Sequence, residues 1–180
     1  MANAAMKVGA FGFLLWLIAV VGLLVLQVTA DIFTADFFEI VLLAGALIIA
    51  LSLLFTSIGL FGLWKHYQSW IAIVTGVIGV LALIAVIVFQ AVPFIGIEFL
   101  TANAVMLGYI ASLLTAFFLV FIAITLVGLE GLINNAAVLP AGIFTAIAGS
   151  IGLIMPEIVY ANLVLVPATI LCIIAFLTGK

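Results

Sequence analysis

Long apolar runs, separated by short stretches that hold charged residues or proline, make up the pattern of this chain. The runs are apolar on every side of a helix and lack the strict alternation that a membrane β-barrel needs. Open strands are excluded in lipid, because each unpaired backbone group there costs several kcal/mol. A helix needs about 20 apolar residues to cross a bilayer. The pattern therefore predicts an all-α, polytopic membrane helix bundle. Its six transmembrane helices are expected at about residues 8–28, 39–63, 70–92, 98–129, 137–155 and 157–178.

Proline and length bear on four of these helices. Pro93 is expected to end the third helix at residue 92, because proline disfavours helix in the residue before it. Pro156 separates the fifth helix from the sixth. The fourth run has about 30 residues, more than an upright crossing requires, so this helix is expected to tilt or to extend beyond the bilayer.

Composition sharpens the picture from helical to membrane-embedded. Of the 180 residues, 71% are apolar and 5% are charged, and the mean hydropathy is +1.74. About a quarter of the residues of a soluble domain are charged, because such a domain must face water. The solvent of this chain is therefore expected to be lipid, and residues 1–180 are expected to form a single transmembrane domain.

Three glutamates indicate an internal repeat. Glu39, Glu98 and Glu157 stand 59 residues apart, and each opens an apolar run. The interval predicts one helical hairpin used three times. The hairpin units are expected at about residues 1–66, 67–134 and 135–180.

The few charges predict an orientation. If the ends of the helices alternate between the two sides, Lys7, Lys65 and Lys180 fall on one side and every acid except Glu130 falls on the other. Positive residues stay in the cytoplasm. The chain is therefore expected in the cell membrane as a multi-pass protein with both termini cytoplasmic. The first helix is expected to be retained, because its apolar stretch exceeds the roughly 7–15 residues of a signal-peptide core.

Small residues form stripes on two of the expected helices. Helices in lipid associate through close backbone approach, because lipid supplies no hydrophobic drive between them. The stripes predict packing faces, inside the bundle or against a neighbouring subunit, with the lining of a narrow pore as the alternative. The faces are Gly45, Ser52, Thr56 and Gly59 in the second helix, and Gly142, Thr145, Gly149 and Gly152 in the fifth.

The three repeated glutamates have two interpretations. A carboxylate at a helix N-terminus is stabilised by the helix dipole by about 0.3–1 kcal/mol, and repetition alone would then explain all three. The alternative is an acidic ring of Glu39, Glu98 and Glu157 on the external face, which would bind a cation or a basic partner.

Candidate catalytic and ligand groups are few. His66 is the single His and lies in an expected cytoplasmic turn, and Cys172 is the single Cys and lies within the sixth helix. A haem needs axial ligands such as His, and a nucleophilic Cys needs a nearby base. We expect no cofactor, no metal site and no enzyme activity. Three Lys cannot form a basic track for nucleic acid.

Hydroxyl residues supply most of the polar groups expected at mid-membrane depth. Each can donate its proton to a carbonyl of its own helix, which favours packing over a solute path. These residues are Ser52, Thr56, Ser57, Thr75, Ser112, Thr115, Thr125, Thr145, Ser150 and Thr169.

Three stretches of the chain are similar to a known family of membrane proteins. They are residues 39–64 with the run Gly45-Ala46-Leu47-Ile48-Ile49, the stretch Gln90-Ala91-Val92-Pro93, and residues 142–157 with Met155-Pro156. In these stretches and in its three short hairpins, the chain resembles the acid-resistance membrane protein family (HdeD-like). The resemblance implies the six-helix topology and a link to acid or envelope stress. The absence of Arg and of a proline in the first external turn departs from that family.

These observations together favour an integral membrane structural or accessory protein. It would be a non-catalytic subunit of a larger membrane complex or a self-associating bundle, with membrane lipids and other membrane subunits, or further copies of itself, as its partners. The alternatives are a channel or carrier for a small neutral solute or protons, and a stress-resistance membrane protein.

Overall fold

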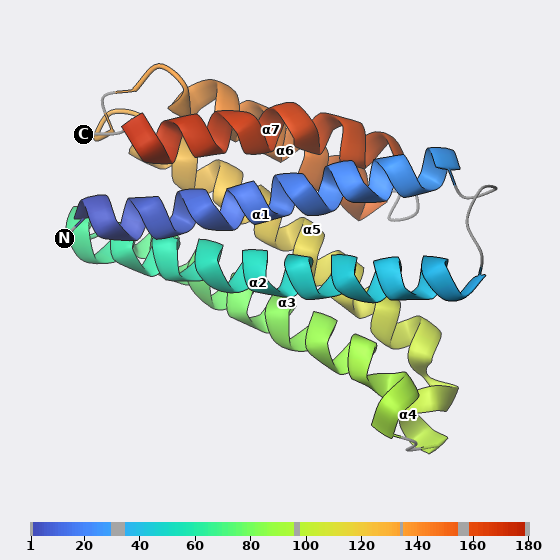
Figure 1. Cartoon of the computed structure of the whole chain (residues 1–180). Helices are drawn as coiled ribbons and strands as arrows, with labels where there is room; N and C mark the ends of the chain where they lie inside the picture. Colours follow the sequence, from blue (N-terminus) through green and yellow to red (C-terminus); the bar gives the residue numbers. More distant parts are fainter. Residues whose placement is uncertain (1, 30–34, 96–97, 134, 155–158, 179–180) are drawn as a thin grey trace.

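The computed structural model describes residues 2–29, 35–95, 98–133, 135–154 and 159–178, and the regular structure in these ranges is helical throughout (Figure 1). Six helices are long, and α4 is a single short turn. Their bounds are α1 Ala2–Thr29, α2 Ala35–Tyr67, α3 Trp70–Ile95, α4 Glu98–Ala102, α5 Ala104–Leu129, α6 Val138–Ile154 and α7 Val159–Thr178.

Helix length and composition identify a membrane protein. Four helices contain stretches long and apolar enough to cross a bilayer: Ala4–Leu26, Leu43–Tyr67, Trp70–Val92 and Ala104–Leu129. The apolar segments of α6 and α7 are shorter. The 17 residues of α6 give it a length of about 26 Å at about 1.5 Å per residue. The prediction of an all-α, multi-pass membrane protein is confirmed by these four spans, whereas crossing by α6 and α7 stays a prediction.

The six long helices pack as a closed ring. Each of α1, α2, α3, α5 and α6 contacts the next long helix, and α7 returns to contact α1. Helices α1, α3 and α6 begin at the end of the bundle where α2, α5 and α7 finish (Figure 1). We call this the lysine end, after Lys7 and Lys65, and the opposite end the α4 end.

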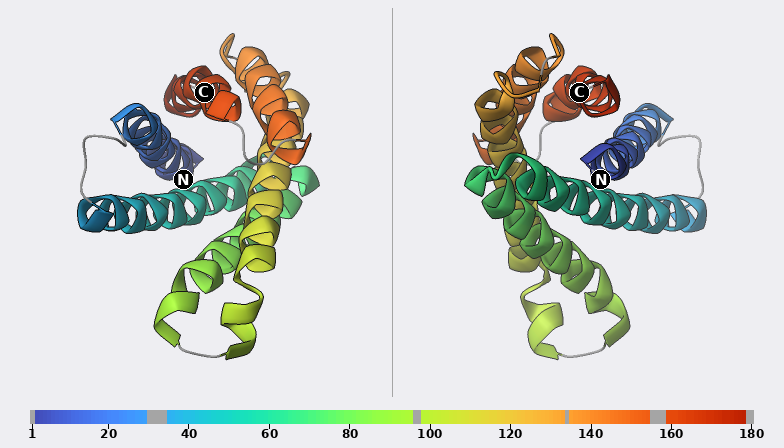
Figure 2. Two further views of the ribbon diagram at one scale, coloured as in Figure 1. Left: turned by 90° about the vertical axis from the view of Figure 1, so that its right-hand side faces the viewer. Right: turned by 90° about the vertical axis from the view of Figure 1, so that its left-hand side faces the viewer.

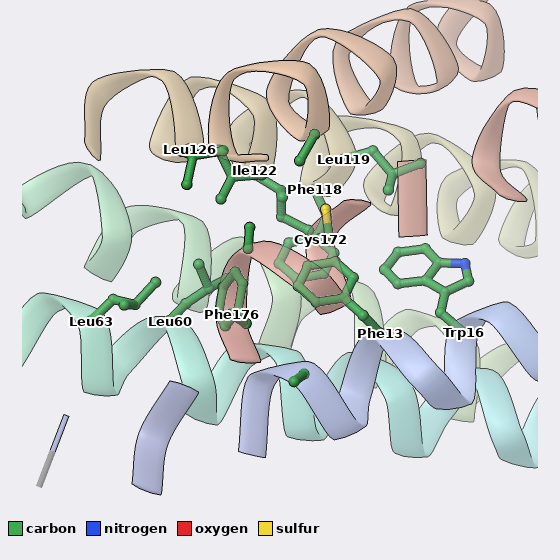
Figure 3. Packing of buried hydrophobic residues seen from close by; sticks show 14 of the residues in the cluster. Phe13, Trp16, Leu60, Leu63, Phe118, Leu119, Ile122, Leu126, Cys172 and Phe176 are labelled. Atoms are coloured by element: carbon green, nitrogen blue, oxygen red, sulfur yellow. The ribbon is translucent and has the colours of Figure 1, made fainter. Parts of the chain in front are cut away.

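Aromatic side chains fill the interior of the ring. Phe13 of α1 meets Phe176 of α7 edge to face, with ring centroids 5.3 Å apart. Trp16 of α1 stacks on Phe118 of α5 across the ring at 6.0 Å. Figure 3 shows these rings surrounded by aliphatic side chains, among them Leu60 of α2. Helices that are not neighbours in the ring therefore meet through large side chains.

Burial is concentrated in the half of the bundle near the lysine end. Near the α4 end, α3 and α5 lead away from the other helices (Figure 2), and Phe94 and Val105 are 75% and 90% exposed. The largest fully buried side chains all lie in the lysine-end halves of their helices or in the α5–α6 linker: Phe13, Leu53, Thr56, Leu60, Leu63, Thr75, Phe118, Ile122, Leu126, Leu129, Ile133 and Val138.

Several expected helix bounds are wrong by a few residues. Helix α1 begins at Ala2, six residues before the expected start at residue 8, and α2 ends at Tyr67, four residues after the expected end at residue 63. Helix α2 begins at Ala35, four residues before Glu39. Helix α3 continues through Pro93 to Ile95. A proline so close to a C-terminus removes one hydrogen bond, and its fixed φ of about −65° is itself helical, so the last turn can still form.

The expected fourth helix is broken rather than continuous. Asn103 separates α4 from α5 with φ −107° and ψ 15°, and its carbonyl accepts the first hydrogen bond of α5, from the Leu107 N–H at 3.0 Å. The side chain of Asn readily bonds to nearby backbone outside a helix. The length beyond one crossing is therefore accommodated by a turn.

A two-residue link joins α2 to α3 at the lysine end. Gln68 adopts the left-handed conformation with φ 53°, and its side-chain amide donates to the Lys65 carbonyl at 3.2 Å. Lys65 and His66 lie in the last turn of α2, where the helix dipole favours positive charge.

Candidate functional site: the contacts between neighbouring helices

Of the three repeated glutamates, Glu98 is the one whose side chain the structure describes. Glu98 is the first residue of α4, and its side chain is exposed. Glu39 lies in the second turn of α2 with a side chain outside the described part of the structure, and Glu157 lies outside the described residues altogether. The acidic ring of these three residues stays a prediction.

Glycine on both helices makes the contact between α1 and α2 very close. A methyl group added to Gly59 of α2 would lie 2.5 Å from the Cα of Gly9 of α1. A methyl group added to Gly12 would lie 2.5 Å from the backbone nitrogen of Thr56, and one on Gly62 would collide with Ala5. Backbone atoms cannot move aside as a flexible side chain can, so this crossing requires glycine.

The expected face on α2 divides into two parts. Ser52, Thr56 and Gly59 are buried. Gly45 is half-buried, and a methyl group added there would meet no described atom within 4 Å. Figure 1 shows α1 and α2 moving apart toward the α4 end. A stripe of small residues therefore continues along α2 beyond the point where the close contact with α1 ends.

The expected face on α6 packs mainly against α5. Methyl groups added to Gly142 and Gly149 would lie 2.9 Å from Val127 Cγ2 and 3.0 Å from the Val120 nitrogen, and one on Gly152 would lie 3.2 Å from the Ala116 Cβ. The remaining member, Thr145, points elsewhere. Its hydroxyl donates to the Ala141 carbonyl at 2.6 Å and lies 3.6 Å from the Cys172 sulfur of α7.

A pair of hydroxyls joins α3 to α5. Thr75 Oγ1 and Thr125 Oγ1 are 2.7 Å apart. Thr75 also lies 2.8 Å from its own Ile71 carbonyl and 3.2 Å from the Phe121 carbonyl, to which Thr125 donates at 2.8 Å. Each hydroxyl has one proton, so either Thr75 or Thr125 can donate to the other. In both cases the accepting threonine donates its own proton to a helix carbonyl.

Two buried hydroxyls depart from the expectation that each bonds to its own helix. Among the described residues, Thr56 Oγ1 and Ser57 Oγ have no hydrogen-bond partner. Thr56 faces the backbone of Gly12 on α1, and Ser57 lies against Gly79 on α3. Both hydroxyls therefore lie at glycine positions in contacts between neighbouring helices. By contrast, the hydroxyls of Ser52, Thr75, Thr115, Thr125, Thr145 and Thr169 contact carbonyls of their own helices.

The candidate ligand residues His66 and Cys172 lie in different environments. His66 is exposed and makes an edge contact with Tyr67 at 4.6 Å. Cys172 is buried beside Thr145. The part of the chain that the structure describes contains no group of three or more His, Cys, Asp or Glu side chains that could hold a metal ion.

The sequence did not lead us to several contact residues, among them Gly9, Gly12 and Asn135. Gly9 and Gly12 form the other half of the α1–α2 crossing, and their spacing of three residues places them on one side of α1. Asn135 bonds to Ala137, just before α6, and to the last turn of α7. A polar residue just before an apolar run is a helix-start signal, and it could have singled out Asn135.

A scan against protein-family models finds no match for this chain, and searches of curated proteins and of solved structures find none either. The assignment as a multi-pass membrane protein rests on the four long apolar helices.

Proposed function

We propose that this chain is a structural or accessory integral membrane protein without enzyme activity, which joins a larger membrane complex or associates with itself. The observation that carries the proposal is the place of the polar groups. The buried hydroxyls and the contact glycines lie between neighbouring helices, while aromatic rings fill the middle of the ring.

A solute path would need polar groups that face a shared space. Thr75 and Thr125 instead face each other between α3 and α5, and Thr145 faces Cys172 between α6 and α7. Phe118, at the centre, is fully buried. This arrangement supports holding helices together over conducting a solute.

The exposed faces are where partners would bind. Large apolar side chains such as Ile18, Leu47 and Ile84 are exposed on the outside of the ring, where lipid or another membrane subunit would cover them. We further propose that both termini lie in the cytoplasm, because lysines favour the cytoplasmic side of a membrane. A reporter that is active only in the cytoplasm, fused to the C-terminus, tests this orientation.

Purification in a mild detergent, followed by reconstitution, tests the proposal. The tagged chain at native expression level should elute with a stoichiometric membrane partner or as an oligomer. Liposomes containing it should show no more water, glycerol, urea or proton flux than empty liposomes. A monomer that conducts one of these solutes would overturn the proposal. A monomer without a partner and without solute flux would contradict the proposed association with other subunits or with itself.

A role in acid resistance depends on the sequence resemblance alone, and the comparisons give it no support. A deletion strain that no longer survives acid, and that survives again when the intact chain is restored, would support this role.

A further inference from the structure

At the lysine end, the side chain of Asn135 bonds both to the last turn of α7 and to the linker just before α6. Its Oδ1 accepts a hydrogen bond from the Ala137 N–H at 2.9 Å, just before α6 begins. Its Nδ2 donates to Thr178 Oγ1 at 2.6 Å and lies 3.3 and 3.4 Å from the carbonyls of Ala175 and Ile174. Only an amide supplies an acceptor and two donors from one short side chain.

The bonds satisfy groups that each helix leaves open. Ala137 immediately precedes α6, and its N–H, like those of the first turn, lacks a partner within the helix. Ala175 is among the last four residues of α7, whose carbonyls lack partners within that helix. The donor and acceptor roles at Thr178 are also compatible. Thr178 donates its own proton to the Ile174 carbonyl at 2.8 Å, which leaves its oxygen free to accept from Asn135.

Phe176 follows Ala175 and makes the contact by which α7 packs against α1. Phe176 is buried, meets Phe13 of α1 at 5.3 Å, and its ring lies against Gly9. Helix α7 closes the ring of helices through this contact with α1. The position of the last turn of α7 therefore sets how Phe176 enters the interior.

We propose that Asn135 is a latch: by bonding the last turn of α7 to the linker before α6, it keeps α7 seated in the ring. This inference does not depend on the function proposed above. The α5–α6 linker would then control the position of α7. Loss of the single amide of Asn135 would release the last turn of α7, and with it the side chains that α7 places in the interior of the ring.

The natural Cys172 provides a probe that needs no added residue. It is the single Cys of the chain, lies one turn before Phe176, and is buried against Thr145 of α6. Release of the end of α7 should expose its thiol. The rate of maleimide labelling in a mild detergent at fixed pH then measures how often α7 leaves its place.

Two substitutions at Asn135 separate the latch from a simple helix cap. N135D keeps the acceptor for Ala137 but sets carboxylate oxygens against the carbonyls of α7, whereas N135A removes both sets of bonds. The latch predicts that N135D labels about tenfold faster than the natural chain and N135A about threefold faster. A residue that only caps α6 would give the opposite order, with N135A the faster.

Two further variants complete the test. T178V removes the nearest acceptor at nearly constant shape and should label about threefold faster. Q68A removes another exposed amide at the same end of the bundle, one that bonds within its own turn, and should label at the natural rate. The latch is overturned if N135A labels as fast as N135D or faster, or if N135D matches the natural chain. If N135D fails to elute as a folded protein, an unchanged rate in T178V overturns it.

Discussion

Two positions on α2 contrast the two ends of this bundle. Gly59, near the lysine end, lies directly against the backbone of Gly9. Gly45, fourteen residues toward the α4 end, faces no described atom within 4 Å of an added methyl group. Both belong to one stripe of small residues. A small residue therefore marks a close contact only where a second helix lies opposite it.

The same difference extends to the whole fold. Near the lysine end, the ring has glycine contacts, a hydroxyl pair and a filled aromatic interior. Near the α4 end the helices diverge (Figure 2). In lipid, apolar side chains gain little by leaving the solvent, so packing is decided by close fit and hydrogen bonds. The lysine-end half should carry most of the stability.

The largest expected effect is at the aromatic centre. Phe118→Ala should cost about 3–5 kcal/mol of unfolding free energy, because it empties the space between Trp16 and Gly79. Phe94→Ala, at the exposed α4 end of α3, should change stability by less than about 0.5 kcal/mol. Unfolding in mixed micelles with rising denaturing detergent measures both. Equal losses would remove the difference between the two ends.

The paired glycines give the next largest effect. Gly59→Val should cost about 3 kcal/mol, because its side chain would meet the backbone of Gly9, which cannot move without separating the helices. Gly45→Val should be tolerated, since the space there is open among the described residues. Thermal stability of both variants in one detergent provides the check. A Gly45 variant as unstable as the Gly59 variant would refute the contrast.

The sequence could predict helices but only part of their contacts. Hydropathy is set residue by residue, so the class of the fold and the approximate spans could be predicted. A face of small residues does not state which helix it meets, so the partnership of Gly59 with Gly9 and the open position of Gly45 could not. The break at Asn103 depends on backbone geometry. A local helix-start signal could have singled out Asn135, but its bonds to α7 depend on distant carbonyls, which no local pattern encodes.

The hydroxyl pair between α3 and α5 should contribute a smaller amount. Thr75→Val and Thr125→Val should each destabilise the bundle, and the double variant should reveal a coupling of about 0.6 kcal/mol, up to about 1.7. A double-mutant cycle in the same micelle assay measures this coupling. Additive losses would mean that the 2.7 Å contact adds nothing beyond each residue's bond to its own helix.

The smallest expected effect is at the link between α2 and α3. Gln68→Gly should stabilise the chain by about 0.5 kcal/mol, because glycine adopts the left-handed conformation at φ 53° without steric cost. The lost bond to the Lys65 carbonyl offsets part of this gain. A higher midpoint of thermal unfolding is the expected result, and a clear decrease would show that the side-chain bond outweighs the backbone strain.

Hydrogen–deuterium exchange along α2 tests the central claim most directly, because both halves belong to one helix in one micelle. Amides of residues 53–66 should exchange slower than those of residues 40–50 by on the order of tenfold or more, since opening the lysine-end half must break the packed ring. Equal protection of the two halves, or slower exchange toward the α4 end, would contradict a bundle held together at its lysine end.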